Sequence, residues 1–156
     1  MCGICGKIVF GKGQNISEDD ISRMSELLKH RGPDSSGVLV KKKVGLGFQR
    51  LSIIDLKMGQ QPMSDISKRY HIIFNGEIYN YVEIKDELIS RGYQFQTNTD
   101  TEVLLNLYIE KGLNCLKKLR GMFSFVIWDE DKDILFCARD RFGKKPFYYS
   151  YNNSRF

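Results

Sequence analysis

The chain opens with residues 1–10, MCGICGKIVF, and this stretch decides how the rest of the fold is organised. Residues 6–10, GKIVF, carry the β-branched and aromatic side chains of a buried strand, and the strand continues back to Cys2. A cysteine therefore stands directly behind the initiator methionine, at the beginning of a core strand. Gly3 follows it directly, and Gly6 comes three residues later.

Cys2 has the chemistry of a nucleophile that carries its own base. Methionine is normally trimmed before a small residue, and trimming would leave a free α-amine beside the Cys2 thiol. The ordinary pKa of a cysteine thiol, about 8.5, lies close to that of an α-amine, about 7.7–8.0, so protons exchange easily between them. Enzymes with an N-terminal threonine use their own amine in this way. An inert buried cysteine is the alternative, and position two alone does not exclude it.

The composition is that of one soluble globular domain. Of the 156 residues, 42% are hydrophobic and 28% are charged, which are ordinary values. There is no membrane-length apolar run and no secretory signal pattern, so we expect reduced cysteines and a cytoplasmic location. The net charge of +5 is scattered, apart from Lys41–Lys43 and Lys144–Lys145, which read as solvated turns. Nucleic-acid binding is therefore not expected.

Strand-like and helix-like segments alternate without a regular repeat. Strands are expected at residues 38–40, 44–48, 70–74, 123–128, 134–138 and 147–151. Helices are expected to begin at capping residues that have an acidic residue three positions later: Ser17, Asn80 and Thr99. Their buried faces include Ile21, Met24, Leu27 and Leu28 in the first helix and Ile84, Leu88 and Ile89 in the second. The pattern predicts an α+β fold with mainly antiparallel sheet.

Asn75-Gly76 is a second candidate site because it follows an expected buried strand. An asparagine amide and a glycine N–H can both point at one developing oxyanion, and one such donor lowers a barrier by about 2.7–4 kcal/mol. Asn-Gly is also the commonest tight-turn dipeptide, so a simple turn is the competing interpretation.

Arg50 and Asp100 could together recognise the two charged ends of an α-amino acid. Arg50 follows a buried strand, where a guanidinium can bind a carboxylate with two parallel hydrogen bonds or form a structural ion pair. Asp100 lies in the first turn of a capped helix, where it can hold a ligand ammonium group or simply interact with the helix dipole.

A metal site is not expected. Cys2-x-x-Cys5 has the spacing of half a zinc site or of a redox pair, but Cys115 and Cys137 are isolated and the two histidines follow no ligand pattern.

Seven motifs in a fixed order support a resemblance that covers nearly the whole chain: MCGI at 1–4, HRGPD at 30–34, RLSI at 50–53, NGEIYN at 75–80, TDTE at 99–102, GMFSF at 121–125 and RDRFG at 139–143. The chain resembles the glutaminase domain of glutamine-hydrolysing asparagine synthetases, a class II glutamine amidotransferase with an N-terminal nucleophile. The resemblance implies a four-layer α-β-β-α sandwich of two antiparallel sheets.

The resemblance also implies roles for individual residues. Cys2 would attack the side-chain amide of L-glutamine, with Asn75 and Gly76 stabilising the oxyanion. Arg50 would bind the α-carboxylate, Asp100 and Glu77 the α-ammonium, and residues Leu51, Ser52, Ile53 and Ile54 would form a wall of the pocket.

The resemblance implies no cofactor in this domain. ATP and magnesium would belong to a synthetase domain that receives the ammonia and is absent here, and residues 1–156 would form an amidotransferase domain truncated at its C-terminal end. A homodimer remains possible. A non-catalytic glutamine-binding remnant is the alternative to a glutaminase. Cys5 stands where many relatives have no thiol, and it is either a buried spectator or a partner that oxidises with Cys2.

Overall fold

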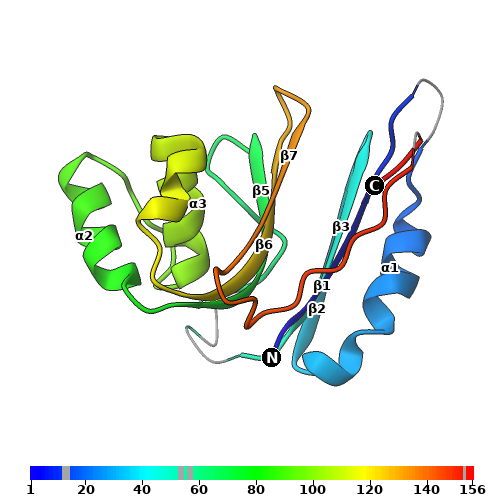
Figure 1. Cartoon of the computed structure of the whole chain (residues 1–156), viewed down its shortest axis with the longest axis horizontal. Helices are drawn as coiled ribbons and strands as arrows, with labels where there is room; N and C mark the ends of the chain where they lie inside the picture. Colours follow the sequence, from blue (N-terminus) through cyan, green and yellow to red (C-terminus); the bar gives the residue numbers. More distant parts are fainter. Residues whose placement is uncertain (12–14, 53–54, 56–57, 153) are drawn as a thin grey trace.

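A computed structural model describes residues 1–11, 15–52, 55, 58–152 and 154–156, and the strands within them form two antiparallel sheets (Figure 1). The first sheet has the order β1-β3-β2, with β1 at Gly3–Ile8, β2 at Ser35–Lys41 and β3 at Val44–Arg50. The second has the order β4-β5-β6-β7, with β4 at Met63–Ser64, β5 at Tyr70–Ile78, β6 at Gly121–Asp129 and β7 at Ile134–Arg139.

The helices lie on the two outer faces of the sheets. Helix α1, Glu18–Glu26, covers the first sheet, whereas α2, Tyr81–Ser90, and α3, Asp100–Lys111, cover the second (Figure 1). Two short 3-10 helices, Lys29–Arg31 and Gly112–Lys117, follow α1 and α3. The layers are therefore helix, sheet, sheet and helix, which confirms the expected α-β-β-α sandwich.

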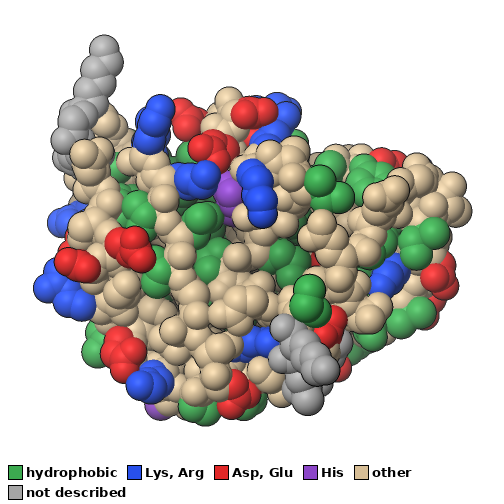
Figure 2. All heavy atoms as spheres, turned by 180° about the vertical axis from the view of Figure 1, so that it is seen from behind, with side chains coloured by type: hydrophobic (Ala, Val, Ile, Leu, Met, Phe, Trp, Pro, Cys, Tyr) green, Lys and Arg blue, Asp and Glu red, His purple; other side chains and the backbone are tan. Residues whose placement is uncertain are grey.

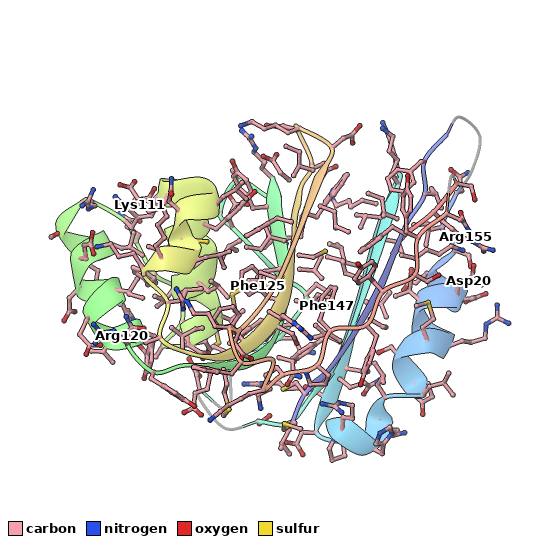
Figure 3. The ribbon with its side chains drawn as sticks, viewed as in Figure 1. Asp20, Lys111, Arg120, Phe125, Phe147 and Arg155 are labelled. Atoms are coloured by element: carbon pink, nitrogen blue, oxygen red, sulfur yellow. The ribbon has the colours of Figure 1, made fainter. Side chains whose placement is uncertain are left out.

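Each layer boundary has its own buried cluster, because alternate side chains of a strand point to opposite faces. In β5, Ile72 and Phe74 pack toward α3, and Ile73 packs toward the first sheet. Phe125 belongs to the helix-side cluster, while Phe147 lies between the two sheets (Figure 3). The inter-sheet layer is the one that matters for the site, because it joins β1 to β5.

Glycines in β3 let α1 pack closely against the first sheet. A Cβ on Gly45 would lie 2.4 Å from Cγ1 of Ile21, which is fully buried. Ser17 caps α1 as expected, since its hydroxyl accepts a hydrogen bond from the N–H of Asp20 at 3.1 Å. The expected apolar face is only partly correct. The helix ends at Glu26, so Leu27 lies beyond its last turn and is exposed, and Met24 is exposed too.

The expected capping box at Asn80 is wrong. The Asn80 side chain makes no cap; its amide instead donates to the carbonyl of Lys118 at 3.0 Å, and its oxygen accepts from the N–H of Arg120 at 2.9 Å. Asn80 therefore ties the start of α2 to the loop before β6. Thr99 does cap α3, accepting from the N–H of Glu102 at 3.3 Å.

The segment after β7 also differs from its prediction. Residues 147–151 form no strand, and Tyr148, Tyr149 and Tyr151 are exposed. The pairing comes later, where Phe156 and Ile8 exchange two backbone hydrogen bonds of 2.8 and 3.0 Å. Aromatic composition alone suggested a strand at 147–151, but backbone pairing with the edge of the first sheet begins only with Ser154 and Phe156.

Basic and acidic side chains are interspersed on the face shown in Figure 2, in keeping with the scattered charge of the sequence. Within the described residues, no helix has the length and apolar character needed to cross a membrane.

Asn80 provides a test of the loop contact. We expect Asn80→Ala to lower the free energy of unfolding by about 1–3 kcal/mol, because two backbone groups lose their partners. Asn80→Asp should also destabilise, since a carboxylate cannot donate to the Lys118 carbonyl. Urea unfolding measures both effects. If Asn80→Asp were as stable as the wild type, a capping role would be indicated, since Asp and Asn cap equally well.

Candidate active site

Cys2 lies at the end of the first sheet, immediately before β1. Its Sγ lies 3.4 Å from the N–H of Leu51, which donates to it, and 3.6 Å from the Leu51 carbonyl. The Arg31 Nε donates to the Cys2 carbonyl at 3.2 Å. The Cys2 side chain packs against the apolar cluster between the sheets, which includes Ile73 and Trp128, so Cys2 faces the second sheet. Two independent contacts therefore fix both the backbone and the sulfur of this residue.

The segment that follows β3 supplies the next part of the site. Arg50 ends β3, is only 6% exposed, and donates from Nη2 to the Asp55 carbonyl at 2.7 Å. Ser52 is held by its N–H, which donates to the Asp34 carboxylate at 2.7 Å. The structure thus places Arg50 and Leu51 in one pocket with Cys2, whereas Ser52, predicted for the same wall, is not among the described residues that line this pocket. Ile53 and Ile54, predicted to line the same wall, lie outside the described residues.

Asn75 and Gly76 lie inside β5, so the interpretation of this dipeptide as a turn is wrong. Gly76 pairs with Phe123 of β6. The Phe123 carbonyl accepts from Asp140 N–H at 2.7 Å and its N–H donates to the Asp140 carboxylate at 3.2 Å, so both groups point away from β5. Antiparallel partners that do not exchange hydrogen bonds point their backbone groups outward. The Gly76 N–H therefore points away from β6.

The backbone of β5 is paired with side chains on either side of Gly76. Two residues before it, the Phe74 N–H donates to Gln61 Oε1 at 2.6 Å; two residues after it, the Ile78 N–H donates to Asp100 Oδ2 at 3.0 Å. Among the described residues we find no acceptor for the Gly76 N–H. The strand edge thus presents one unused donor between two occupied ones.

Asn75 points its side chain to the opposite face from Phe74, toward the first sheet and Cys2. It is 4% exposed, and among the described residues its side-chain amide has no hydrogen-bond partner. A second donor therefore lies beside the Gly76 N–H, which is the arrangement that an oxyanion site requires.

Asp100 begins α3 and is buried. Burial raises the pKa of its carboxyl group to about 6, and the charge of Glu77 adds to the rise, while hydrogen bonds from the backbone of Ile78 and Thr101 oppose it. A cation bound beside this carboxylate would offset the cost of ionising it. Asp100 is therefore suited to hold an ammonium group.

One pocket collects these groups. It has a volume of about 90 Å³ and is lined by the predicted residues Cys2, Arg50, Leu51, Asn75, Gly76, Glu77 and Asp100. A larger cavity of about 900 Å³ lies between the sheets beside Phe147, and Asn75 lines both spaces. The chain thus brings residues from two sheets and one helix to the same place.

Several pocket residues were missed by sequence reasoning. Gln61 lines the pocket, accepts from Phe74, and donates to Thr101 Oγ1 at 3.2 Å. Gly59 leaves room for Arg50, because a Cβ on it would lie 2.3 Å from the Arg50 Nη2. Lys145 and Met122 also line the pocket. Gln61 and Gly59 fall in a turn-rich stretch without a periodic pattern, and nothing in the sequence alone singles them out.

Cys5 faces the other side of the first sheet. Its sulfur packs toward α1, since a Cβ on Gly47 would lie 2.7 Å from Cys5 Sγ and 3.2 Å from the Ser25 Cβ. Burial raises the pKa of the Cys5 thiol to about 11. The strand alternation separates it from Cys2, and both cysteines are free thiols. The interpretation of Cys5 as a buried spectator is therefore favoured.

Comparisons with known proteins relate the chain to one family. The family model described as "Glutamine amidotransferase domain" matches residues 1–156. Asparagine synthetase [glutamine-hydrolyzing] 1 of Bacillus subtilis is 48% identical in an alignment 159 residues long that covers 99% of this chain and 25% of that protein. Putative asparagine synthetase [glutamine-hydrolyzing] 2 of Methanocaldococcus jannaschii is 41% identical in an alignment 175 residues long that covers 100% of this chain and 33% of that protein. The chain thus spans a quarter to a third of these relatives.

Solved structures share the fold at lower identity. The glutamine phosphoribosylpyrophosphate amidotransferase of B. subtilis, in complex with ADP and GMP, has a TM-score of 0.63 at 23% identity and covers 81% of this chain and 35% of its own. An allosteric regulatory enzyme of purine biosynthesis has a TM-score of 0.67 at 22% identity, covering 87% of this chain and 37% of its own. The sequence match and the sandwich fold show that the chain belongs to the glutamine amidotransferase domain family.

Proposed function

We propose that this domain hydrolyses L-glutamine to glutamate and ammonia through a thioester on Cys2. The observation that supports the proposal most is the convergence of a thiol, two unused hydrogen-bond donors, a buried guanidinium and a buried carboxylate on one pocket. The family match adds the substrate class, because its members are amidotransferases that use glutamine.

The reaction begins when the Cys2 sulfur attacks the amide carbon of the glutamine side chain. After removal of Met1, the Cys2 α-amine takes the thiol proton, and the carbonyl π electrons move to the oxygen. The Asn75 amide and the Gly76 N–H stabilise that oxyanion. When the oxyanion collapses, the C–N bond breaks and the protonated α-amine gives its proton to the departing ammonia. Water then attacks the thioester, releasing glutamate and restoring the thiol.

The charged groups of the pocket orient the substrate. Arg50 binds the α-carboxylate, and Asp100 with Glu77 binds the α-ammonium. These two contacts fix both ends of an α-amino acid, so the side-chain amide is directed toward Cys2. An analogue without the α-amino group, or one without the α-carboxylate, lacks one of the two contacts and is expected to bind less well.

The ammonia is proposed to serve an ATP-dependent amide-forming domain of the asparagine synthetase type. The names of the relatives support this destination, and the chain matches only 25–33% of their length. The alternative is a glutamine-binding module without turnover. Glutamate release by the chain with Met1 removed separates the two functions.

The first prediction concerns the nucleophile. Cys2→Ala and Cys2→Ser should abolish glutamate and ammonia release while leaving the melting temperature within a few degrees of the wild type, because Cys2 is partly exposed. A form that keeps Met1 should also be inactive, because its base has become an amide nitrogen. Enzyme-coupled glutamate detection and mass measurement of the N-terminus provide the test. Turnover by the form that keeps Met1 would contradict the mechanism.

The second prediction concerns Gly59. Gly59→Ala should push the Arg50 guanidinium aside, since the new Cβ would lie 2.3 Å from its Nη2. Loss of a charge-assisted hydrogen bond is worth about 1.5–3 kcal/mol, so KM for glutamine should rise about 10- to 100-fold with kcat little changed. Arg50→Lys, which keeps the charge without the planar fork, should have a similar effect. An unchanged KM in both variants would remove Arg50 from substrate binding.

The third prediction concerns Asp100. The pKa of its carboxyl group, about 6, lies above the ordinary value of 3.8. Ionised Asp100 therefore destabilises the folded state above pH 6, and this destabilisation disappears as the pH falls from 6 toward 4. Asp100→Asn keeps an acceptor for the Ile78 N–H and removes the charge. We expect it to raise the free energy of unfolding by on the order of 1–3 kcal/mol at pH 7.5, and by less at pH 5.

Urea unfolding at the two pH values checks this difference, with the exposed Asp86→Asn as the matched control. Glutamine binding, measured by calorimetry on an inactive Cys2→Ala background, should weaken in Asp100→Asn and not in Asp86→Asn. Equal binding by both variants would argue against Asp100 as the ammonium partner.

A further inference from the structure

Lys145 is a buried cation in the pocket for which the reaction described above has no role. The residue is 5% exposed, and its Nζ lies 2.9 Å from the Met1 Sδ. An ammonium group has three donors and a thioether is a weak acceptor. Among the described residues, Lys145 Nζ has no carboxylate partner within ion-pair distance. A lysine this buried is normally paired, because removing a charge from water costs several kcal/mol.

The fold fixes the position of Lys145 through the turn that follows β7. The Asp140 carboxylate accepts backbone hydrogen bonds from Phe142, Lys144 and Lys145 at 3.0–3.1 Å. The segment passes beside the N-terminus (Figure 1) and then turns between the sheets, where Phe147 lies (Figure 3). Both ends of the segment are therefore held, and the Lys145 side chain is directed to the start of the chain.

Removal of Met1 changes the surroundings of this ammonium group. The Met1 side chain leaves with its sulfur. The Cys2 nitrogen, which had been the amide nitrogen bonded to Met1, becomes a free α-amine. Both Cys2 and Lys145 line the same pocket. Two cations in one pocket repel, so the charge on one amine disfavours the protonated form of the other. The ordinary pKa of an α-amine, about 7.7–8.0, lies more than two units below that of a lysine, about 10.4. The α-amine is therefore the group that loses its proton.

We propose that Lys145 is a positioning residue whose ammonium charge keeps the α-amine of Cys2 in its neutral, proton-accepting form. The inference rests on the proposed function, in which that amine is the base. Lys145 itself does not transfer a proton. Its charge disfavours the protonated form of the α-amine, so that the amine can take the thiol proton at neutral pH.

Other charges also face the amine, and they stay the same when Lys145 is changed. They come from the 3-10 helix after α1, from β3, from β5 and from α3: Arg31, Arg50, Glu77 and Asp100. Asp100 has a pKa of about 6 and titrates in the acidic part of the tested range, so the Lys145 variants are compared above that pH, where this carboxylate is ionised.

The experiment compares the wild type, Lys145→Met, Lys145→Arg and the exposed control Lys144→Met, all with Met1 removed. The readout is kcat/KM for glutamine hydrolysis between pH 5.5 and 9.5. In Lys145→Met, the acidic limb of the profile of kcat/KM against pH should move to higher pH by about 0.5–1 unit. The value of kcat/KM should then fall about 3- to 10-fold at pH 7 and change little at pH 9. Lys145→Arg should restore the wild-type limb, and Lys144→Met should not move it.

A purely structural role of Lys145 would lower kcat/KM by the same factor at every pH, and that result would overturn the inference. A pH profile of Lys145→Met that coincides with that of the wild type would overturn it too. A second measurement does not need turnover. In a Cys2→Ser background, the pH dependence of acylation of the α-amine by acetic anhydride, read by mass spectrometry, reports its titration midpoint. A higher midpoint in Lys145→Met supports the inference even if no form hydrolyses glutamine, in which case only the proposed function fails. An unmoved midpoint overturns the role of Lys145 whether or not the wild type is active.

Discussion

The edge of β5 is the constraint on which the site depends. Antiparallel pairing with β6 forces the N–H groups of Phe74, Gly76 and Ile78 outward, and buried backbone donors need acceptors. Gln61 and Asp100 supply acceptors at either side of Gly76. The same contacts bring the start of α3 to the strand, so the pairing that completes the sheet also positions the carboxylate of the pocket. Among the described residues, the Gly76 N–H between them has no acceptor, and it is the donor that the proposed mechanism uses.

The charged groups buried in the pocket cost free energy, and their opposite charges compensate for this cost only in part. Asp100 is buried near Glu77, and Lys145 is buried against a thioether. Such groups lower the stability of the empty domain. A zwitterionic amino acid supplies one charge of each sign, so it relieves the carboxylate and occupies the guanidinium together. In the proposed binding mode, selectivity for α-amino acids would follow from the cost of leaving the site empty, as well as from direct contacts.

Much of the fold could be predicted from the sequence, because the hairpins and the caps at Ser17 and Thr99 are local signals. The predicted site residues Cys2, Arg50, Asn75, Gly76 and Asp100 also meet in one pocket. The errors have physical reasons. Asn80 matches a capping pattern, but its amide pairs with a loop that only tertiary structure brings close. Lys145 appears as half of a solvated Lys-Lys turn, and its burial depends on the Asp140 turn and on the path between the sheets.

The division of the site between the sheets makes it sensitive to their separation. Cys2 belongs to the first sheet, and Asn75 and Gly76 belong to the second, with Phe48, Ile73 and Trp128 packed in the layer between. A small sliding or spreading of this layer would leave each sheet intact yet draw the sulfur away from the donors proposed for the oxyanion. The inter-sheet core therefore aligns the groups proposed for catalysis, and on this proposal loosening it would impair turnover well before the domain unfolds.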